Sequence, residues 1–183
     1  MTSACKVAIV PANGCYDVYN CFWYGWLHKQ LTQSHVHCVL RSMPEPDIAR
    51  ESIWIPFMRN DLECDEQTII VGHVLGAEAA MRFAEKYKVK GIVLVSACVT
   101  DLGIARERES GYFDRPWKWV KIKSNTDFVM QFGSKNDPII PWKEQERIAD
   151  ALNVDLHIFK RGHFMTSTFP ELLELIISKV KIS

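Results

Sequence analysis

The chain has 183 residues, of which 48% are hydrophobic and 24% are charged, a composition typical of one soluble globular domain. Its 22 Lys and Arg residues balance 22 Asp and Glu residues, so no overall charge attracts nucleic acid or an acidic membrane surface. No apolar run approaches the ~20 residues of a membrane span, and the N-terminal run is too short for an export signal. We therefore predict a single domain over residues 1–183 in the cytoplasm, with the nucleus as a second location.

Six cysteines are scattered along the chain, and without an export signal we expect reduced thiols instead of disulfides. They are Cys5, Cys15, Cys21, Cys38, Cys64 and Cys98. There is no Cys-x-x-Cys pair and no His/Cys cluster at zinc spacing, so we predict neither a metal site nor a cofactor.

Six short runs rich in β-branched residues recur along the chain, and five longer segments with helical spacing lie between and after them. The runs are apolar throughout, which is typical of strands covered on both faces. They lie at residues 6–11, 37–40, 67–72, 91–97, 127–133 and 155–159. The helical segments lie at residues 23–31, 52–62, 77–87, 142–152 and 170–180. This alternation predicts a three-layer α/β sandwich of about six parallel strands, and the irregular stretch 100–124 is expected to form a lid.

In such a sheet the chemistry gathers at the carboxyl ends of the strands. Gly72 and Gly76 frame a turn from the third strand into a helix, as in the Gly-x-Ser-x-Gly nucleophile elbow of α/β hydrolases. Asp137 follows the fifth strand and His163 the sixth, which is the chain order of the acid and the base in a hydrolase triad. Each feature alone has a common structural explanation, since Asp-Pro initiates turns and loop histidines are frequent at surfaces. Their joint order favours a minimal α/β-hydrolase fold.

Long, distinctive segments of the sequence resemble the retinoblastoma-binding protein 9 family of small serine hydrolases. The resemblance runs nearly end to end, on WYGW at 23–26, MPEPDIARESIWIPFM at 43–58, CDEQTIIVGH at 64–73, SGYFDRPWKW at 110–119, QFGSKNDPIIPWKEQE at 131–146 and GHF at 162–164. By analogy with the hydrolase fold, it implies strand order 2-1-3-4-5-6, with Asp137 and His163 as acid and base. In that family a serine lies between the elbow glycines, where this chain has Val74 followed by Leu75.

Valine at the elbow has no lone pair with which to attack a carbonyl and no proton for His163 to take. Because a β-branched residue is unfavourable at positive φ, valine at this position suggests that selection for the strained turn has relaxed. The resemblance places the oxyanion region at Asn13 and Gly14, in a loop after the first strand that is poorer in glycine than the family's, and at Leu75 in the elbow. Asp137 and His163 are then expected to remain as a hydrogen-bonded pair, with Nδ1 of His163 within reach of the carboxylate.

Two cysteines are alternative nucleophiles. Cys15 follows the first strand on the same rim as His163, where a thiolate beside an imidazolium would be activated. The loop that holds Cys15 normally supplies oxyanion donors, so an attack from there would come from the wrong side. Cys98 follows the fourth strand and is expected to be a small buried residue.

A separate motif, Leu62-Glu63-Cys64-Asp65-Glu66, matches the Leu-x-Cys-x-Glu segment that binds retinoblastoma-type pocket proteins. Leu62, Cys64 and Glu66 would make that contact if the backbone were extended and accessible. The motif lies between a predicted helix and a central strand, so we expect Leu62 or Cys64 to be buried. Lys118, Lys121 and Lys123, interleaved with tryptophans, are too few to indicate nucleic-acid binding.

The sequence thus leaves three hypotheses. The leading one is a catalytically silent relative of a serine hydrolase that binds a protein or a small acyl-type ligand through the old pocket. The second is a working esterase or amidase with another nucleophile. The third is an interaction protein that binds a retinoblastoma-type protein through Leu62, Cys64 and Glu66 and needs no pocket.

Overall fold

The computed structural model describes residues 4–181, which build a six-stranded, wholly parallel sheet of order β2-β1-β3-β4-β5-β6. The strands are β1 Lys6–Val10, β2 His37–Val39, β3 Thr68–His73, β4 Val89–Val95, β5 Thr126–Ser134 and β6 Leu156–Phe159. The predicted fold class and strand order are confirmed. The order reverses between β1 and β3, so the crevice where α/β folds place their chemistry opens at the ends of these two strands.

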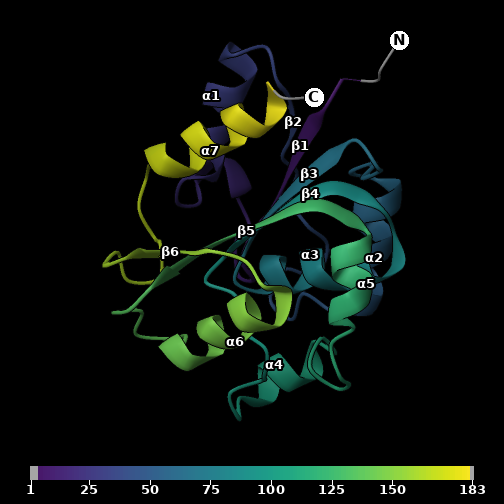
Figure 1. The fold of residues 1–183 in the computed structure, drawn as a ribbon, viewed down its shortest axis with the longest axis vertical. Helices are drawn as coiled ribbons and strands as arrows, with labels where there is room; N and C mark the ends of the chain where they lie inside the picture. The colour runs from purple at the N-terminus through teal and green to yellow at the C-terminus, as the bar shows by residue number, and fades with distance from the viewer. Residues whose placement is uncertain (1–3, 182–183) are drawn as a thin grey trace.

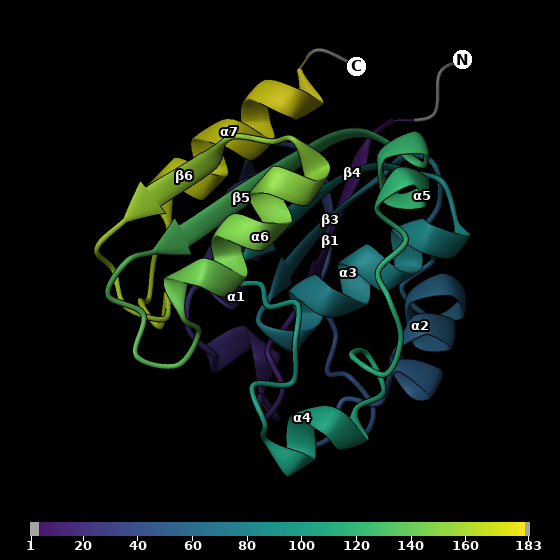
Figure 2. The ribbon, with the colours of Figure 1, turned by 60° about the horizontal axis from the view of Figure 1, so that its bottom comes forward.

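Helices cover both faces of the sheet (Figure 1), with α1 and α7 together on one side and α2, α3, α5 and α6 on the other. Their bounds are α1 Tyr24–Gln33, α2 Glu51–Asn60, α3 Leu75–Lys86, α4 Ala105–Glu109, α5 Trp119–Ser124, α6 Trp142–Leu152 and α7 Pro170–Val180, with a short 3-10 turn at Val18–Asn20. Figure 2 shows α4 apart from the sheet, at the bottom of the view.

Alternate residues of each central strand enter opposite hydrophobic cores. In β1, Ala8 and Val10 pack into the core under α2 and α3, whereas Val7 and Ile9 pack into the core under α1 and α7. Because successive side chains of a strand point to opposite faces, a strand covered twice must be apolar at every position. This explains why the strands read as continuous apolar runs in the sequence.

The stretch 100–124, which was expected to be irregular, contains the short helices α4 and α5. It is tied to α3 by Arg82, whose side chain is fully buried. The Arg82 guanidinium donates to the carbonyl oxygens of Tyr112, Arg115 and Pro116, pairs with Glu85, and stacks over Trp117 at 3.7 Å. Glu85 also accepts the N–H of Lys118. A planar fork of donors suits this task, because it meets several acceptors without rotating.

The expectation that all cysteines are reduced is wrong for two of them, since Cys15 and Cys21 form a disulfide. They are six positions apart in sequence, and the bridge closes the loop between β1 and α1. The other four, Cys5, Cys38, Cys64 and Cys98, are free and buried. Burial raises the pKa values of Cys38 and Cys64 to about 12, so these thiols stay protonated.

We expect Arg82→Met to lower the free energy of unfolding by about 3–5 kcal/mol, because it leaves Glu85 buried without its partner. Chemical denaturation measures the loss, and amide exchange should quicken around Tyr112. Arg147→Ala is the control, because Arg147 is exposed and should change stability by no more than about 0.5 kcal/mol. Adding Glu85→Met to Arg82→Met should recover part of the loss. A single variant as stable as the wild type would show that the segment needs no anchor.

Candidate functional site

The turn between β3 and α3 has the backbone of a nucleophile elbow. Val74 lies between the last residue of β3 and the first of α3, with φ 56° and ψ −120°. Non-glycine residues are strained there, at a cost on the order of 1–3 kcal/mol. The strained turn is therefore kept at Val74, although this side chain carries no nucleophile.

Close backbone contacts explain why the turn is flanked by glycines. A Cβ on Gly72 would lie 2.2 Å from the carbonyl oxygen of Gly76, and a Cβ on Gly76 would lie 2.2 Å from that of Val10. Neither glycine has a positive φ, so space and not backbone conformation requires them. The start of α3 is thus pressed against the end of β1, and Val74 is forced to the top of the turn.

Asp137 and His163 meet as the sequence predicts. Nδ1 of His163 lies 2.8 Å and 3.0 Å from the two carboxylate oxygens of Asp137, which confirms the expected contact. Burial by itself would raise the pKa of Asp137, but the hydrogen bonds from His163 and from the N–H groups of Ile139 and Ile140 hold that pKa below its usual value. The carboxylate is therefore ionised and orients the imidazole, as the acid of a triad does.

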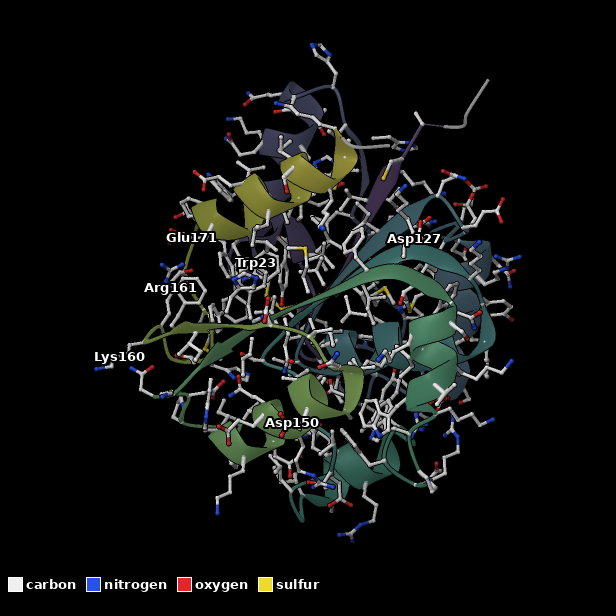
Figure 3. The ribbon with its side chains drawn as sticks, in the orientation of Figure 1. Trp23, Asp127, Asp150, Lys160, Arg161 and Glu171 are labelled. Carbon is white, nitrogen blue, oxygen red and sulfur yellow. A yellow bond between two sulfur atoms is a disulfide. The ribbon has the colours of Figure 1, made fainter. Side chains whose placement is uncertain are left out.

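The loop that carries His163 is fixed from several sides. Trp23 donates its indole N–H to the carbonyl oxygen of Phe164 at 3.0 Å. Arg161 forms a two-pronged ion pair with Glu171 at 2.7 Å and 2.8 Å, and the two side chains lie side by side in Figure 3. These contacts anchor the loop to α1 and to the first turn of α7.

His73, within the elbow sequence, belongs to a buried hydrogen-bond relay. The Ala12 N–H donates to the Tyr24 hydroxyl, this hydroxyl donates to Nδ1 of His73, and Nε2 of His73 donates to the carbonyl oxygen of His163. A carbonyl only accepts, so His73 must carry its proton on Nε2. Burial, reinforced by the nearby His163, lowers the pKa of His73 to about 3, so the ring is neutral at physiological pH.

The predicted oxyanion region is only partly available. The N–H of Gly14 is bound to the carbonyl oxygen of Pro46 at 2.8 Å, so Gly14 cannot act as the donor that was expected. Asn13 is half-buried in the same loop. The N–H of Leu75 heads α3 and is one of the donors that a helix leaves unpaired at its start. One of the oxyanion donors is thus in place, at the residue after Val74.

A small cavity of about 40 Å³ adjoins the elbow; we call it the elbow pocket. Its walls are mainly apolar, formed by Val74, Leu75, Leu102, Ile104, Phe113, Ile139 and Ile140. The polar groups that line it are Glu78, Cys98, Thr100 and Glu107. A cavity next to a nucleophile position is where a substrate or ligand is expected to bind.

Two acidic residues of the elbow pocket were not predicted from the sequence. Glu78 lies one helical turn after Val74 in the otherwise apolar run Ala77–Met81, and it is 1% exposed. Its Oε1 accepts the N–H of Cys98, and its Oε2 has no partner among the described residues. Burial raises the pKa of Glu78 well above its usual value, and burial also raises that of Glu107. The i, i+4 spacing from Val74 is the signal that could have identified Glu78.

Neither alternative cysteine is a reactive thiol. Cys15 is held in the disulfide with Cys21. Cys98 is buried as expected, and its thiol donates to the carbonyl oxygen of Thr100 at 3.0 Å and to Glu144 at 3.2 Å. Burial and the neighbouring Glu78 raise the pKa of Cys98 far above its usual value. A thiol that cannot ionise is a poor nucleophile.

The Leu-x-Cys-x-Glu segment is partly buried. Leu62 and Cys64 are each 1% exposed, which confirms the expectation, and Glu66 is the exposed one of the three motif residues. To bind a retinoblastoma-type pocket protein through this motif, Leu62 and Cys64 would have to leave the hydrophobic core. That interaction stays a prediction, and it requires local unfolding before β3.

Comparison with known proteins identifies the family. The family described as "Serine hydrolase" matches residues 7–173. The chain belongs to the serine hydrolase family. The chain is 52% identical over 180 residues to Serine hydrolase RBBP9 of Rattus norvegicus, with 97% of each chain covered, so the resemblance seen in the sequence is confirmed.

Solved structures show the same fold. The ydeN gene product of B. subtilis superposes with a TM-score of 0.87 at 23% identity, over 97% of this chain and 100% of that one. A meta-cleavage product hydrolase of Pseudomonas fluorescens IP01 superposes with a TM-score of 0.73 at 14% identity, over 98% and 92% of the two chains. At this identity the likeness concerns the fold alone.

Two further findings concern the part of the chain that the structure describes. Among residues 4–181, no cluster of three or more His, Cys, Asp or Glu side chains could hold a metal ion. Over the same residues, no helix combines the length and the apolarity needed to cross a bilayer.

The strain at Val74 predicts an order of stabilities. We expect Val74→Gly to be more stable than Val74→Ala by about 1 kcal/mol or more, because only glycine adopts this backbone freely. Ala151→Gly, within α6, is the control and should lose up to about 1 kcal/mol. Thermal or urea unfolding measures the differences. If the Ala variant proves the more stable at position 74, the turn is not strained in solution.

The neutral relay predicts a dependence of stability on pH. The pKa of His73 falls from 6.5 to about 3 on folding, so the unfolded chain binds a proton there between these values while the folded chain does not. Stability from this residue is therefore fully present above pH 6.5 and is lost as the pH falls, by up to about 1.4 kcal/mol per pH unit. His73→Gln should remove this contribution, as urea unfolding of both proteins at several pH values would show. Parallel pH profiles would contradict a neutral His73.

Proposed function

We propose that this member of the serine hydrolase family does not run serine-hydrolase chemistry and acts by binding a small ligand in the elbow pocket. The observation that carries the proposal is that the backbone of a nucleophile elbow holds a side chain without a nucleophile. Val74 occupies the backbone position from which an elbow presents its nucleophile, and a valine side chain forms no acyl-enzyme.

The rest of the site supports binding in place of turnover. Asp137 and His163 remain paired, and their loops are anchored by Ile139, Trp23 and Arg161. Removal of a triad nucleophile leaves only a residual acceleration of roughly 10³-fold over water, from binding and oxyanion stabilisation. The N–H of Gly14 is bound to Pro46, and this lowers even the residual acceleration, because a missing oxyanion donor costs about 10²–10³-fold.

A working hydrolase with another nucleophile is the competing function, and the pocket offers little to support it. Cys98 holds its proton, and the Thr100 hydroxyl donates to Glu144 at 2.8 Å. Both groups donate to Glu144, and although burial by itself would raise its pKa, the hydrogen bonds that Glu144 accepts hold that pKa below the usual value, so it is a weak base. No observation in the site favours this function over binding.

We expect the native protein to show no labelling by fluorophosphonate probes and no burst of p-nitrophenyl ester cleavage. Intact-mass spectrometry after incubation with the probe measures the first, and stopped-flow absorbance measures the second. Stoichiometric labelling at any residue would contradict the proposal and would locate the true nucleophile.

Val74→Ser should recover part of the reactivity, because Gly72, Gly76 and the Asp137–His163 pair are already in place. We expect recovery to remain about 10²-fold or more below that of an intact site, since Gly14 supplies no donor. Val74→Ser combined with His163→Ala is the control and should lose the gain. A folded Val74→Ser protein that stays inert toward several acyl and phosphonyl probes would show that more than the nucleophile is missing.

A further inference from the structure

The elbow pocket contains an unusual polar atom. Oε2 of Glu78 is buried, has no partner among the described residues, and belongs to a side chain that lines the cavity. The other carboxylate oxygen is already used by the N–H of Cys98. A buried polar atom without a partner is costly, and structures retain few of them without a reason. Oε2 of Glu78 is therefore the natural contact for a ligand.

The charged groups nearest to Glu78 in the elbow pocket are acidic. Glu107 from α4 lines the same pocket, and the charges of Glu107 and Glu144 both disfavour ionisation of Glu78. No Lys, Arg or His side chain is among the described residues that line the cavity. An anion placed there would face the charge of Glu107 and would keep Glu78 protonated, whereas a cation would stabilise the ionised form of both carboxyl groups.

We propose that the elbow pocket binds a small alkylammonium ion, whose charged head pairs with Glu78 and Glu107 and whose hydrocarbon part contacts the apolar walls. The inference rests on the proposed function, because it assigns a ligand chemistry to the same pocket. Leu75 and Ile140 form inner walls, and the partly exposed Ile104 and Ile139 leave room at the mouth for a longer chain.

Binding has a proton balance that can be measured. In the free protein burial holds Glu78 in its protonated form, so pairing with an ammonium ion transfers the Glu78 proton to solvent while the amine keeps its own. The other titratable groups that act on this site are Glu107 and Glu144, with Arg106, Asp101 and His163 acting in turn on Glu107. Affinity should rise with pH until the amine itself deprotonates, near pH ~10.

The test compares three ligands of equal chain length: n-butylammonium, the neutral acyl compound butanamide, and the acyl anion butyrate. Methyl NMR of Leu75 and Ile140 reports binding in the pocket, and calorimetry in two buffers of different ionisation enthalpy reports proton release. We expect n-butylammonium to bind at least about ten-fold more tightly than the other two, as a charge-assisted hydrogen bond implies. Binding should tighten between about pH 6 and about pH 8, with release of up to one proton.

Variants locate the interaction. Glu78→Gln should weaken n-butylammonium binding by at least about ten-fold and abolish proton release, because the amide carries no charge. Glu107→Gln should weaken it less and provides a second reading if Glu78→Gln does not fold. Glu146→Gln, on the exposed side of α6, is the matched control and should leave binding unchanged. Nα-acetyl-lysine amide distinguishes a free amine from a lysine side chain as the natural source of the cation.

The outcomes separate this inference from the function on which it rests. If butanamide or butyrate binds as tightly as n-butylammonium, or if Glu78→Gln binds the cation normally, the cation preference is wrong while ligand binding stands. If none of the three shifts the methyl signals, the inference is overturned. Covalent labelling of the native protein by a serine-directed probe would instead overturn the proposed function.

Discussion

The contact between the first turn of α3 and the end of β1 is the constraint on which the site depends. No side chain fits between Gly76 and the carbonyl oxygen of Val10, so the helix lies directly against the strand. The chain must then reverse within one residue after β3, and Val74 takes the strained conformation that makes this possible. The same approach places the N–H of Leu75 at the head of α3 and brings Glu78, one turn later, to the wall of the elbow pocket.

Much of this architecture could be predicted from the sequence because it follows from periodic burial. Runs that are apolar at every position specify a parallel sheet between two helical layers, and the order of Gly72, Asp137 and His163 specifies the edge of that sheet. The backbone at Val74 was not predictable from its side chain. The rigidity of the surrounding turn outweighs the preference of a β-branched residue.

Other features depend on long-range contacts that a single sequence does not display. The N–H of Gly14 is engaged by Pro46, a residue far along the chain, and no local pattern announces this bond. Cys15 and Cys21 form a disulfide, although composition alone predicted that both thiols are reduced. Helices α4 and α5 form in a segment with weak periodicity, whose position is set by the buried Arg82.

Titratable groups around the elbow are held in different protonation states by their partners. Asp137 is ionised because three hydrogen-bond donors surround it, and His73 is neutral because it is buried between a hydroxyl and a carbonyl oxygen. Glu78 is kept protonated because it is buried and only one of its two carboxylate oxygens has a hydrogen-bond donor among the described residues. Only the last of these groups is incomplete, so it is the one whose state a small molecule would change most.

Arg82 holds the segment 100–124 beside the elbow pocket, and the contacts that it uses affect how the sequence of this segment can diverge among relatives. The guanidinium contacts the carbonyl oxygens of Tyr112, Arg115 and Pro116, which every amino acid supplies, and not their side chains. Substitutions in the segment can therefore alter the side chain at Phe113, which lines the pocket, without displacing the backbone that carries it. Such an arrangement lets relatives of this protein exchange one binding preference for another while the main chain of the segment 100–124 keeps its position.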